Sequence, residues 1–332
     1  MERQHDTTDR TVVERLRSHP YAGLLFNASP AALWLAIFFL VPLALMFAYS
    51  FGERGAFGEV LLGLEHLGLQ NYRTFFVPDG LTLLETIWVS LGWFVGWVIP
   101  GLQVTEAAPT AYVQLTLRSI WYGIVATVVC FLIGYPTAYY IAKLAPAEHR
   151  NLLLALVVLP YWASYLVRIY AVKLLLAKNG IIPSLVGTLP FVSNQPSLLY
   201  NSFAVEFGLV YIWLPFMILP AYASIEQIDF TMQEAAMDLG ADRLDAFLRV
   251  TFPLSLPGVV AGSILVFIPS VGAYVIPELL GGPSNSTIGR FIAAQFGAAG
   301  NWPLGAAASF VLMAIMMGSI WIYLRRAGGG LA

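Results

Sequence analysis

The chain has 332 residues, of which 58% are hydrophobic and only 11% charged, and its mean hydropathy is +0.74. Soluble domains usually carry about a quarter charged residues, so this chain has too few to cover a surface that faces water. The formal net charge of −2 excludes a large basic surface for nucleic acid. We therefore expect a protein of the lipid bilayer.

The sequence offers no pattern for binding a metal. The single cysteine, Cys130, lies inside an apolar run, so neither a disulfide nor a Cys-based zinc site can form within the chain. The four histidines are scattered through polar stretches and do not form a close pair that carboxylates could complete. We expect no metal site and no cofactor bound by this chain.

Six apolar runs are long enough to cross a bilayer as helices. A spanning helix needs about 20 mostly apolar residues, because every backbone polar group must be satisfied without water. The runs are Ala31–Ser50, Ser119–Ala142, Asn151–Leu174, Ala204–Ser224, Pro257–Pro277 and Leu304–Leu324. Since they are continuous and do not alternate with period two, a β-barrel is excluded. The predicted fold is an all-α polytopic membrane protein with six transmembrane helices.

The first apolar run is too long for the core of a signal peptide, so we interpret it as a retained first span. The predicted organisation follows the chain in order. It comprises a cytoplasmic segment 1–30, a first span 31–50, an external loop 51–118, a core of five spans at 119–324 that contains a loop at 225–256, and a cytoplasmic tail 325–332.

An extra apolar segment, Thr86–Leu102, complicates the span count. It has no charge in 17 residues and contains three tryptophans, but glycine and proline interrupt it. With six spans and a cytoplasmic N-terminus, ten Lys and Arg residues lie inside and six outside, whereas a seventh span gives eight on each side. Positive charge accumulates on the cytoplasmic side, which favours six spans. We interpret the segment as an interfacial or re-entrant helix on the outer face.

The loop Ile225–Pro257, between the fourth and fifth predicted spans, is polar and carries helix signals. Thr231 and Glu234 have the spacing of a capping box that begins a helix, and Gly240 is suited to end it. Asp242 can cap a second helix, which Pro253 would stop. The sequence predicts a helix–glycine–helix module on the membrane surface.

This module is acidic, with six Asp and Glu residues against two Arg. An anionic inner leaflet would repel it, and a simple connection between two spans needs only a few residues. We therefore expect its polar face to bind a partner and not to rest on lipid headgroups.

The loop resembles the EAA loop of permease subunits of binding-protein-dependent ABC importers. The resemblance consists of Glu234-Ala235-Ala236, Gly240 after three further residues, and the run Val250–Pro253, in which Val250 and Phe252 are conservative departures. In that family the short helix docks in a cleft of the cytoplasmic ATPase. The residues that the resemblance implies for ATPase coupling are Glu234, Ala235, Ala236, Asp238, Leu239 and Gly240.

Further blocks extend the resemblance, in order, over roughly residues 110–325. The blocks Pro160–Tyr170, Tyr211–Asp229, Val266–Gly282 and Asn301–Ala307 are similar to spermidine/putrescine permeases of the PotB/PotH type. The resemblance implies a bacterial inner-membrane importer with a second permease subunit, two copies of an ABC ATPase and an extracytoplasmic binding protein. ATP and Mg²⁺ would be bound by the ATPase, because this chain has no G-x-x-x-x-G-K-[ST] phosphate loop. The chain would then be a transport subunit and not an enzyme, with both termini in the cytoplasm.

A pathway for polyamines should offer carboxylates and aromatic faces, because both attract ammonium groups. Glu206, in the fourth span, and Glu278, at the outer end of the fifth, are the best-placed acids. The aromatic candidates are Tyr161, Trp162, Tyr165, Tyr211, Trp213, Phe216 and Tyr274. The alternative is that the acids lie at the water interface and that the aromatics serve packing or an interfacial belt. Arg168, in the third span, is expected to be structural and to pair with an acid such as Glu206 or bind a carbonyl.

Three classes of function compete. The first is an ABC importer permease for polyamines, with opines, aminoalkylphosphonates or ferric iron as alternative substrates. The second is a secondary transporter or channel that works without ATP, which often shows inverted repeats. The third is an intramembrane enzyme, which would need paired catalytic groups, although only Glu206 and Arg168 lie deep in the spans. We favour the first, because it alone gives the EAA-like loop a purpose.

Overall fold

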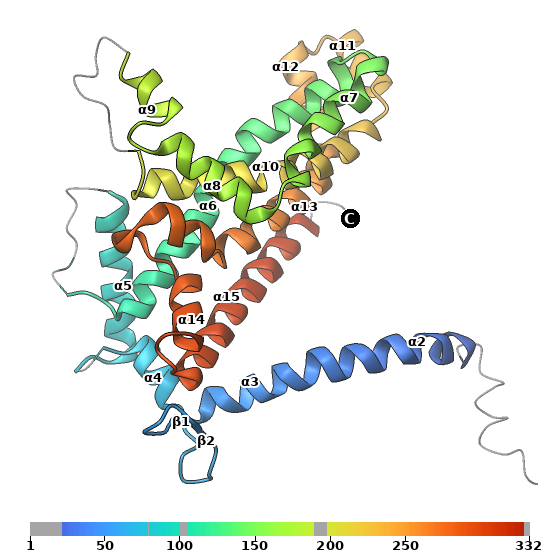
Figure 1. The fold of residues 1–332 in the computed structure, drawn as a ribbon. Helices are drawn as coiled ribbons and strands as arrows, with labels where there is room; N and C mark the ends of the chain where they lie inside the picture. Colours follow the sequence, from blue (N-terminus) through green and yellow to red (C-terminus); the bar gives the residue numbers. More distant parts are fainter. Residues whose placement is uncertain (1–21, 79, 100–104, 106, 189–197, 329–332) are drawn as a thin grey trace, which may run out of the picture.

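The computed structural model describes residues 22–328 apart from 79, 100–104, 106 and 189–197, and its regular structure is almost entirely helical (Figure 1). Among these described residues, six helices are long and apolar enough to cross a membrane: Ser29–Phe51, Ala111–Leu144, Tyr165–Val186, Ser202–Glu226, Arg243–Val271 and Trp302–Trp321. The predicted all-α fold with six spans is confirmed. Residues 1–21 of the predicted N-terminal segment and 329–332 of the predicted tail lie outside the described residues.

Three helices form the centre of the molecule: α6 (Ala111–Tyr139, continued by the π-helical turn η2, Tyr140–Leu144), α10 (Ser202–Glu226) and α13 (Phe252–Val271). Cys130, Met217 and Val266, one from each helix, are buried together where they meet. Lipid supplies no hydrophobic force between helices, so the bundle depends on close van der Waals contact. Gly258 provides such a contact, because a Cβ there would lie 2.4 Å from the Pro220 carbonyl oxygen of α10.

The first span is a long helix built from α2 (Ala22–Leu35), the π-helical turn η1 (Ala36–Leu40) and α3 (Val41–Phe51). It extends away from the other helices (Figure 1), and none of its apolar window is buried. Only its α3 end packs against α15 (Trp302–Gly328), where the ring centroids of Phe47 and Phe310 are 5.1 Å apart. The rest of its apolar surface is left for lipid or another protein.

The segment between α3 and α6 contains β1 (Glu53–Arg54), which pairs antiparallel with β2 (Val60–Leu61), and then α4 (Gln70–Phe76) and α5 (Leu83–Val98). A capping box of Thr82 and Glu85 begins α5, and hydrogen bonds from Thr82 hold the pKa of the Glu85 carboxyl below its usual range. The helix covers most of the Trp-rich segment and is too short to count among the six spans. Residues 100–102 of the segment lie outside the described residues, and its interfacial or re-entrant placement stays a prediction.

The prediction of one continuous span over Asn151–Leu174 was wrong. The structure has α7 (Ala147–Val158), a 3₁₀ turn η3 (Leu159–Trp162) and α8 (Tyr165–Leu176), and the candidate span begins at Tyr165 and includes α9 (Ile181–Val186). Pro160 lacks the N–H that an α-helix would use at this point. The chain is then extended at Ser164, whose side chain caps α8 by accepting from the Val167 amide at 3.4 Å.

The predicted polar loop forms α11 (Thr231–Asp238) and α12 (Arg243–Ala246), joined at Gly240. Gly240 has a φ of +98°, and Asp242 caps α12 by accepting from the Asp245 amide at 2.6 Å, so both of these predictions are confirmed. The predicted capping box of Thr231 and Glu234 is absent from this helix start. Instead, Asp229 Oδ1 accepts from the Thr231 amide at 3.0 Å and from its hydroxyl at 2.8 Å, which lowers the pKa of the Asp229 carboxyl.

Pro253 does not end the second helix of the loop, which contradicts the sequence prediction. The helix continues from α12 through a π-helical turn, η4 (Phe247–Thr251), directly into α13. Pro253 lies in the first turn of α13, where a missing N–H is tolerated, and the wide turn before it accommodates the change in backbone pairing. The fifth span therefore begins at Arg243 and ends at Val271, earlier than the predicted Pro257–Pro277. It is followed by η5 (Pro277–Gly281), η6 (Pro283–Asn285) and α14 (Ile288–Phe296).

Replacing Gly258 by alanine should destabilise the contact of α13 with α10, because the new Cβ would collide with the Pro220 carbonyl oxygen. Overpacking of this kind costs about 1–3 kcal/mol, so the midpoint of thermal unfolding in lipid nanodiscs should fall. The matched control is Gly318→Ala in α15, where an added Cβ meets nothing within 4 Å. Equal midpoints for the two variants would contradict the close approach.

Candidate functional site

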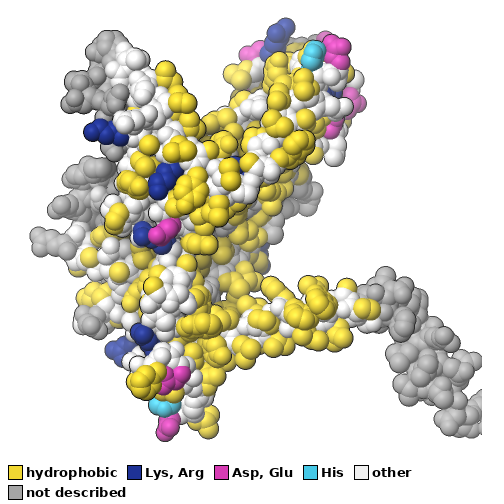
Figure 2. Space-filling model, in the orientation of Figure 1, with side chains coloured by type: hydrophobic (Ala, Val, Ile, Leu, Met, Phe, Trp, Pro, Cys, Tyr) yellow, Lys and Arg dark blue, Asp and Glu magenta, His cyan; other side chains and the backbone are white. Residues whose placement is uncertain are grey.

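Two regions hold the residues that the sequence singled out. The first is the coupling tip, named for its predicted role and formed by α11 and α12, which lie at the same end of the molecule as α7 (Figure 1). Acidic, basic and histidine side chains gather on it (Figure 2). The predicted coupling residues Glu234, Ala235, Asp238, Leu239 and Gly240 are exposed, and Ala236 is half-buried. Leu239 is 90% exposed, so the tip presents an apolar side chain among charged ones.

The buried side of α11 is fixed to the end of α6 by Lys143. The Lys143 ammonium donates to the side-chain oxygen of Gln233, which is 5% exposed. The same ammonium lies 4.0 Å from the centre of the Phe230 ring, within the range of a cation–π contact. The sequence does not reveal this contact, because Lys143 and Gln233 are 90 positions apart and only the fold brings them together.

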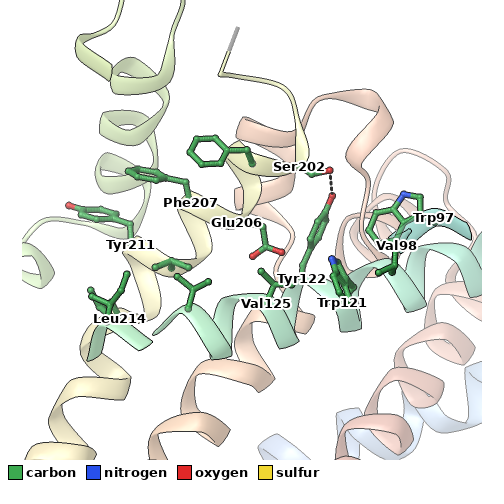
Figure 3. Close-up of a pocket in the computed structure, with 14 residues that line it drawn as sticks. Trp97, Val98, Trp121, Tyr122, Val125, Ser202, Glu206, Phe207, Tyr211 and Leu214 are labelled. Carbon is green, nitrogen blue, oxygen red and sulfur yellow. Dashed lines mark hydrogen bonds between the residues drawn. The ribbon is translucent and has the colours of Figure 1, made fainter. Parts of the chain in front are cut away.

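The second region is the Glu206 cavity, a hollow of about 740 Å³ between α5, α6 and α10 (Figure 3). Glu206 points from α10 toward α6, beside Tyr122 and Val125 (Figure 3). Both of its carboxylate oxygens are buried and have no hydrogen-bond partner among the described residues. Of the predicted pathway residues, the structure brings Glu206 and Tyr211 together in this cavity.

Five aromatic residues that line the Glu206 cavity were not predicted: Trp97 of α5, Trp121 and Tyr122 of α6, and Phe203 and Phe207 of α10. The Tyr122 hydroxyl lies 3.1 Å from Ser202 Oγ and 3.3 Å from the side-chain oxygen of Asn285. These bonds connect the cavity wall to the start of α10 and to η6. The available signal was the Trp-rich segment itself, whose place beside α6 the sequence did not reveal.

Glu278, the other predicted acid, lies in η5 and already has a counter-charge. It forms an ion pair with Arg290 of α14, which also donates to the Gly282 carbonyl at 3.1 Å and to Ser286 Oγ at 3.2 Å. Glu278 is half exposed in this pair, and the neighbouring candidate Tyr274 is also exposed. The two predicted acids therefore differ, since Glu206 lacks the partner that Glu278 has.

The remaining aromatic candidates lie in η3, at the start of α8 and in the middle of α10. Phe216 packs at 5.5 Å from Tyr161 and 5.6 Å from Trp213, between ring centroids, and the Tyr161 hydroxyl donates to the Ile212 carbonyl. Two others differ in exposure: Tyr165 packs against the buried core, whereas Trp162 is 84% exposed. These candidates do not line the Glu206 cavity.

The expected pairing of Arg168 with Glu206 or a carbonyl is not found among the described residues. The Nε and Nη1 atoms of Arg168 are buried without a hydrogen-bond partner. The guanidinium carbon instead lies 4.1 Å from the centre of the Tyr161 ring, so an aromatic face takes the place of the expected carboxylate. Arg168 and Glu206 thus occupy separate environments.

No family model matches the chain. Among curated proteins, it is 35% identical over 292 residues to the spermidine/putrescine transport system permease protein PotB of Haemophilus influenzae, which covers 88% of this chain and 90% of that protein. It is 38% identical over 232 residues to PotB of Escherichia coli, which covers 70% of this chain and 84% of that protein.

Among solved structures, a bacterial ABC transporter involved in the import of the acidic polysaccharide alginate aligns with a TM-score of 0.64. The alignment covers 95% of this chain and 98% of the other, at 16% sequence identity. At this identity, the likeness shows a shared fold alone.

Replacing Lys143 by methionine should loosen α11, because it removes both the hydrogen bond to Gln233 and the contact with the Phe230 ring. Amide hydrogen exchange over Thr231–Asp238 should become roughly three- to thirty-fold faster, while exchange in α13 stays the same. Lys143→Arg keeps a cation over the ring and should protect α11 nearly as well as lysine. Unchanged exchange in the methionine variant would show that α11 is held by other contacts.

Proposed function

The chain belongs to the family of spermidine/putrescine transport permeases, and on this premise we propose that it is the transmembrane permease subunit of an ATP-driven importer of polyamines. The observation that carries the proposal is the 35% sequence identity to PotB, in an alignment that covers 88% of this chain. The chain is a multi-pass membrane protein and a transport subunit, and it is not itself an enzyme.

The substrate class is supported by the charge of the Glu206 cavity. Its one carboxylate has no partner among the described residues, and an unpaired charge among apolar side chains favours a cation over an anion. An opine or an aminoalkylphosphonate would bring a carboxylate or phosphonate toward Glu206, at an energetic cost. Polyamines bring ammonium groups joined by hydrocarbon, and both parts match the lining.

The coupling tip is proposed as the docking site for a cytoplasmic ATPase, through Glu234, Leu239 and Gly240. The α12, η4 and α13 segments form one continuous helical path from the tip into the centre of the bundle. A displacement of the tip by the ATPase would therefore be passed to α13 without an intervening loop. The proposed assembly contains a second permease subunit, two ATPase copies that bind ATP and Mg²⁺, and an external binding protein. Both termini of this chain would face the cytoplasm of a bacterial cell.

The polyamine assignment is tested by ATP hydrolysis of the purified assembly in lipid, with its binding protein present. Spermidine and putrescine should each stimulate hydrolysis, whereas an aminoalkylphosphonate at the same concentration should not, because Glu206 disfavours an anion. Stimulation by the phosphonate alone would move the substrate to that class. Hydrolysis that responds to no solute would contradict a coupled importer of polyamines.

Substitutions at the coupling tip should impair the coupling of ATP hydrolysis to transport. Glu234→Lys reverses an exposed charge on α11, and Gly240→Asp puts a side chain at a φ of +98°, where residues other than glycine are strained. Both variants should insert normally but lose at least about ten-fold in ATP-driven uptake, which corresponds to about 1.4 kcal/mol of coupling. Glu148→Lys, an exposed charge reversal on α7 at the same end, is the matched control. Normal uptake by both tip variants would contradict the assignment of the coupling tip as the docking site for the ATPase.

A further inference from the structure

We propose that the Glu206 cavity binds one primary ammonium end of the transported amine, and that the Trp-rich helix α5 forms part of this binding site. The inference rests on the proposed function for the identity of the cargo. It assigns a role to a segment that neither the coupling tip nor the six spans explains.

The charge of the cavity suits an ammonium group. Glu206 is the only charged residue among the described residues that line it, and its two oxygens are buried without a hydrogen-bond partner. A buried carboxylate in apolar surroundings is costly unless a donor reaches it. An ammonium group supplies both the opposite charge and three N–H donors. A metal ion fits less well, since the described residues contain no cluster of three or more ligating side chains.

The aromatic walls of the cavity also suit a cation. The ring centroid of Trp97 lies 6.5 Å from that of Trp121 and 6.4 Å from that of Tyr122, with interplanar angles of 86° and 73°. Rings set nearly at right angles present faces in different directions, and the negative face of an aromatic ring attracts cations. Trp97 already makes such a contact, because the Arg118 guanidinium carbon lies 5.4 Å from its ring centre. Arg118 itself is not part of the cavity lining and donates to the Ser284 carbonyl instead.

The size and apolar lining of the cavity suit the hydrocarbon part of a polyamine. A volume of about 740 Å³ lies within the range of small-molecule sites. The aliphatic part of the lining is made by Val98, Val125, Val129, Ile133, Val210 and Leu214. These side chains suit the methylene chain between two ammonium groups. With one carboxylate available, the cavity neutralises one ammonium, and the other end of the amine must reach a partner elsewhere along the pathway.

The helix α5 offers an internal comparison between two tryptophans. Trp97 lines the cavity, whereas Trp88, on the same helix, is 75% exposed and does not. If α5 served only as an interfacial anchor, the two residues would matter about equally. If α5 belongs to the ammonium site, Trp97 should matter for the cation and Trp88 should not.

The direct test uses the wild-type assembly in nanodiscs and an apolar carbodiimide, which modifies carboxyl groups in apolar surroundings. Modification of Glu206 is measured by mass spectrometry with putrescine, with spermidine, and with butane-1,4-diol, which matches putrescine in length but has no charge. A carboxyl group activated by a carbodiimide can also form an amide with a primary amine, so this amide is counted as labelling together with the carbodiimide adduct. We expect both amines to reduce labelling of Glu206 at least about five-fold and the diol to leave it unchanged. Equal labelling with and without amine would overturn the site.

The second test measures the KM for putrescine uptake. Trp97→Leu should raise it roughly three- to thirty-fold and Glu206→Gln roughly thirty-fold or more, while the matched controls Trp88→Leu and Glu226→Gln stay within about two-fold. Equal effects of the two tryptophan variants would remove α5 from the site. If the Glu206 variant fails to assemble, the labelling of the wild type still decides the inference.

The two tests also separate the inference from the proposed function. Normal uptake of polyamines without protection of Glu206 would overturn the site and leave the importer intact. Protection of Glu206 in an assembly that neither hydrolyses ATP nor transports in response to polyamines would overturn the importer and support the site.

Discussion

The close contact of α6, α10 and α13 is the interaction on which the rest of the structure depends. In a bilayer, association of helices relies on packing and hydrogen bonds, so glycines that let two backbones approach closely stabilise the bundle. Gly208 of α10 lies against η5, where an added Cβ would be 2.5 Å from a methyl group of Leu280. Glu206 is two residues away and therefore on the opposite face of the helix. The packing that fixes α10 thus also directs Glu206 into the cavity.

Much of the fold could be predicted because span length and apolar composition are physical requirements of the bilayer. The count of six was correct, and the third and fifth spans, whose bounds were wrong, contain prolines at the points of error. Pro160 lies where the helix is broken, between α7 and α8. Pro215 and Pro220 lie inside α10 without ending it. Pro253 was expected to end a helix but lies in the first turn of α13. The same residue has three outcomes because the position of its missing N–H relative to neighbouring carbonyls decides the result. Composition does not encode that position.

The candidate sites divide in the same way. A carboxylate inside a span is expensive, so Glu206 stood out from the sequence, and the exposed coupling tip followed from its motif. The sequence could not show that Glu278 has a counter-charge in Arg290 or that Arg168 lies against the Tyr161 ring. It also could not place Trp97 beside Trp121 and Tyr122, since these residues belong to two different helices, α5 and α6. Contacts of this kind arise from packing, which local patterns do not specify.

The wide turn η4, between α12 and α13, has a consequence for insertions and deletions. A π-helical turn holds about one residue more than an α-helical turn, so it can absorb a register difference between the segments on either side. Loss of one residue within Phe247–Thr251 would convert the turn to an ordinary α-helical one and keep both flanking faces in their directions. Loss of one residue in the α-helical part of α13 would instead rotate the coupling tip by about 100° around the helix axis. The angular setting of the tip is therefore buffered at one place in the chain and sensitive at the others.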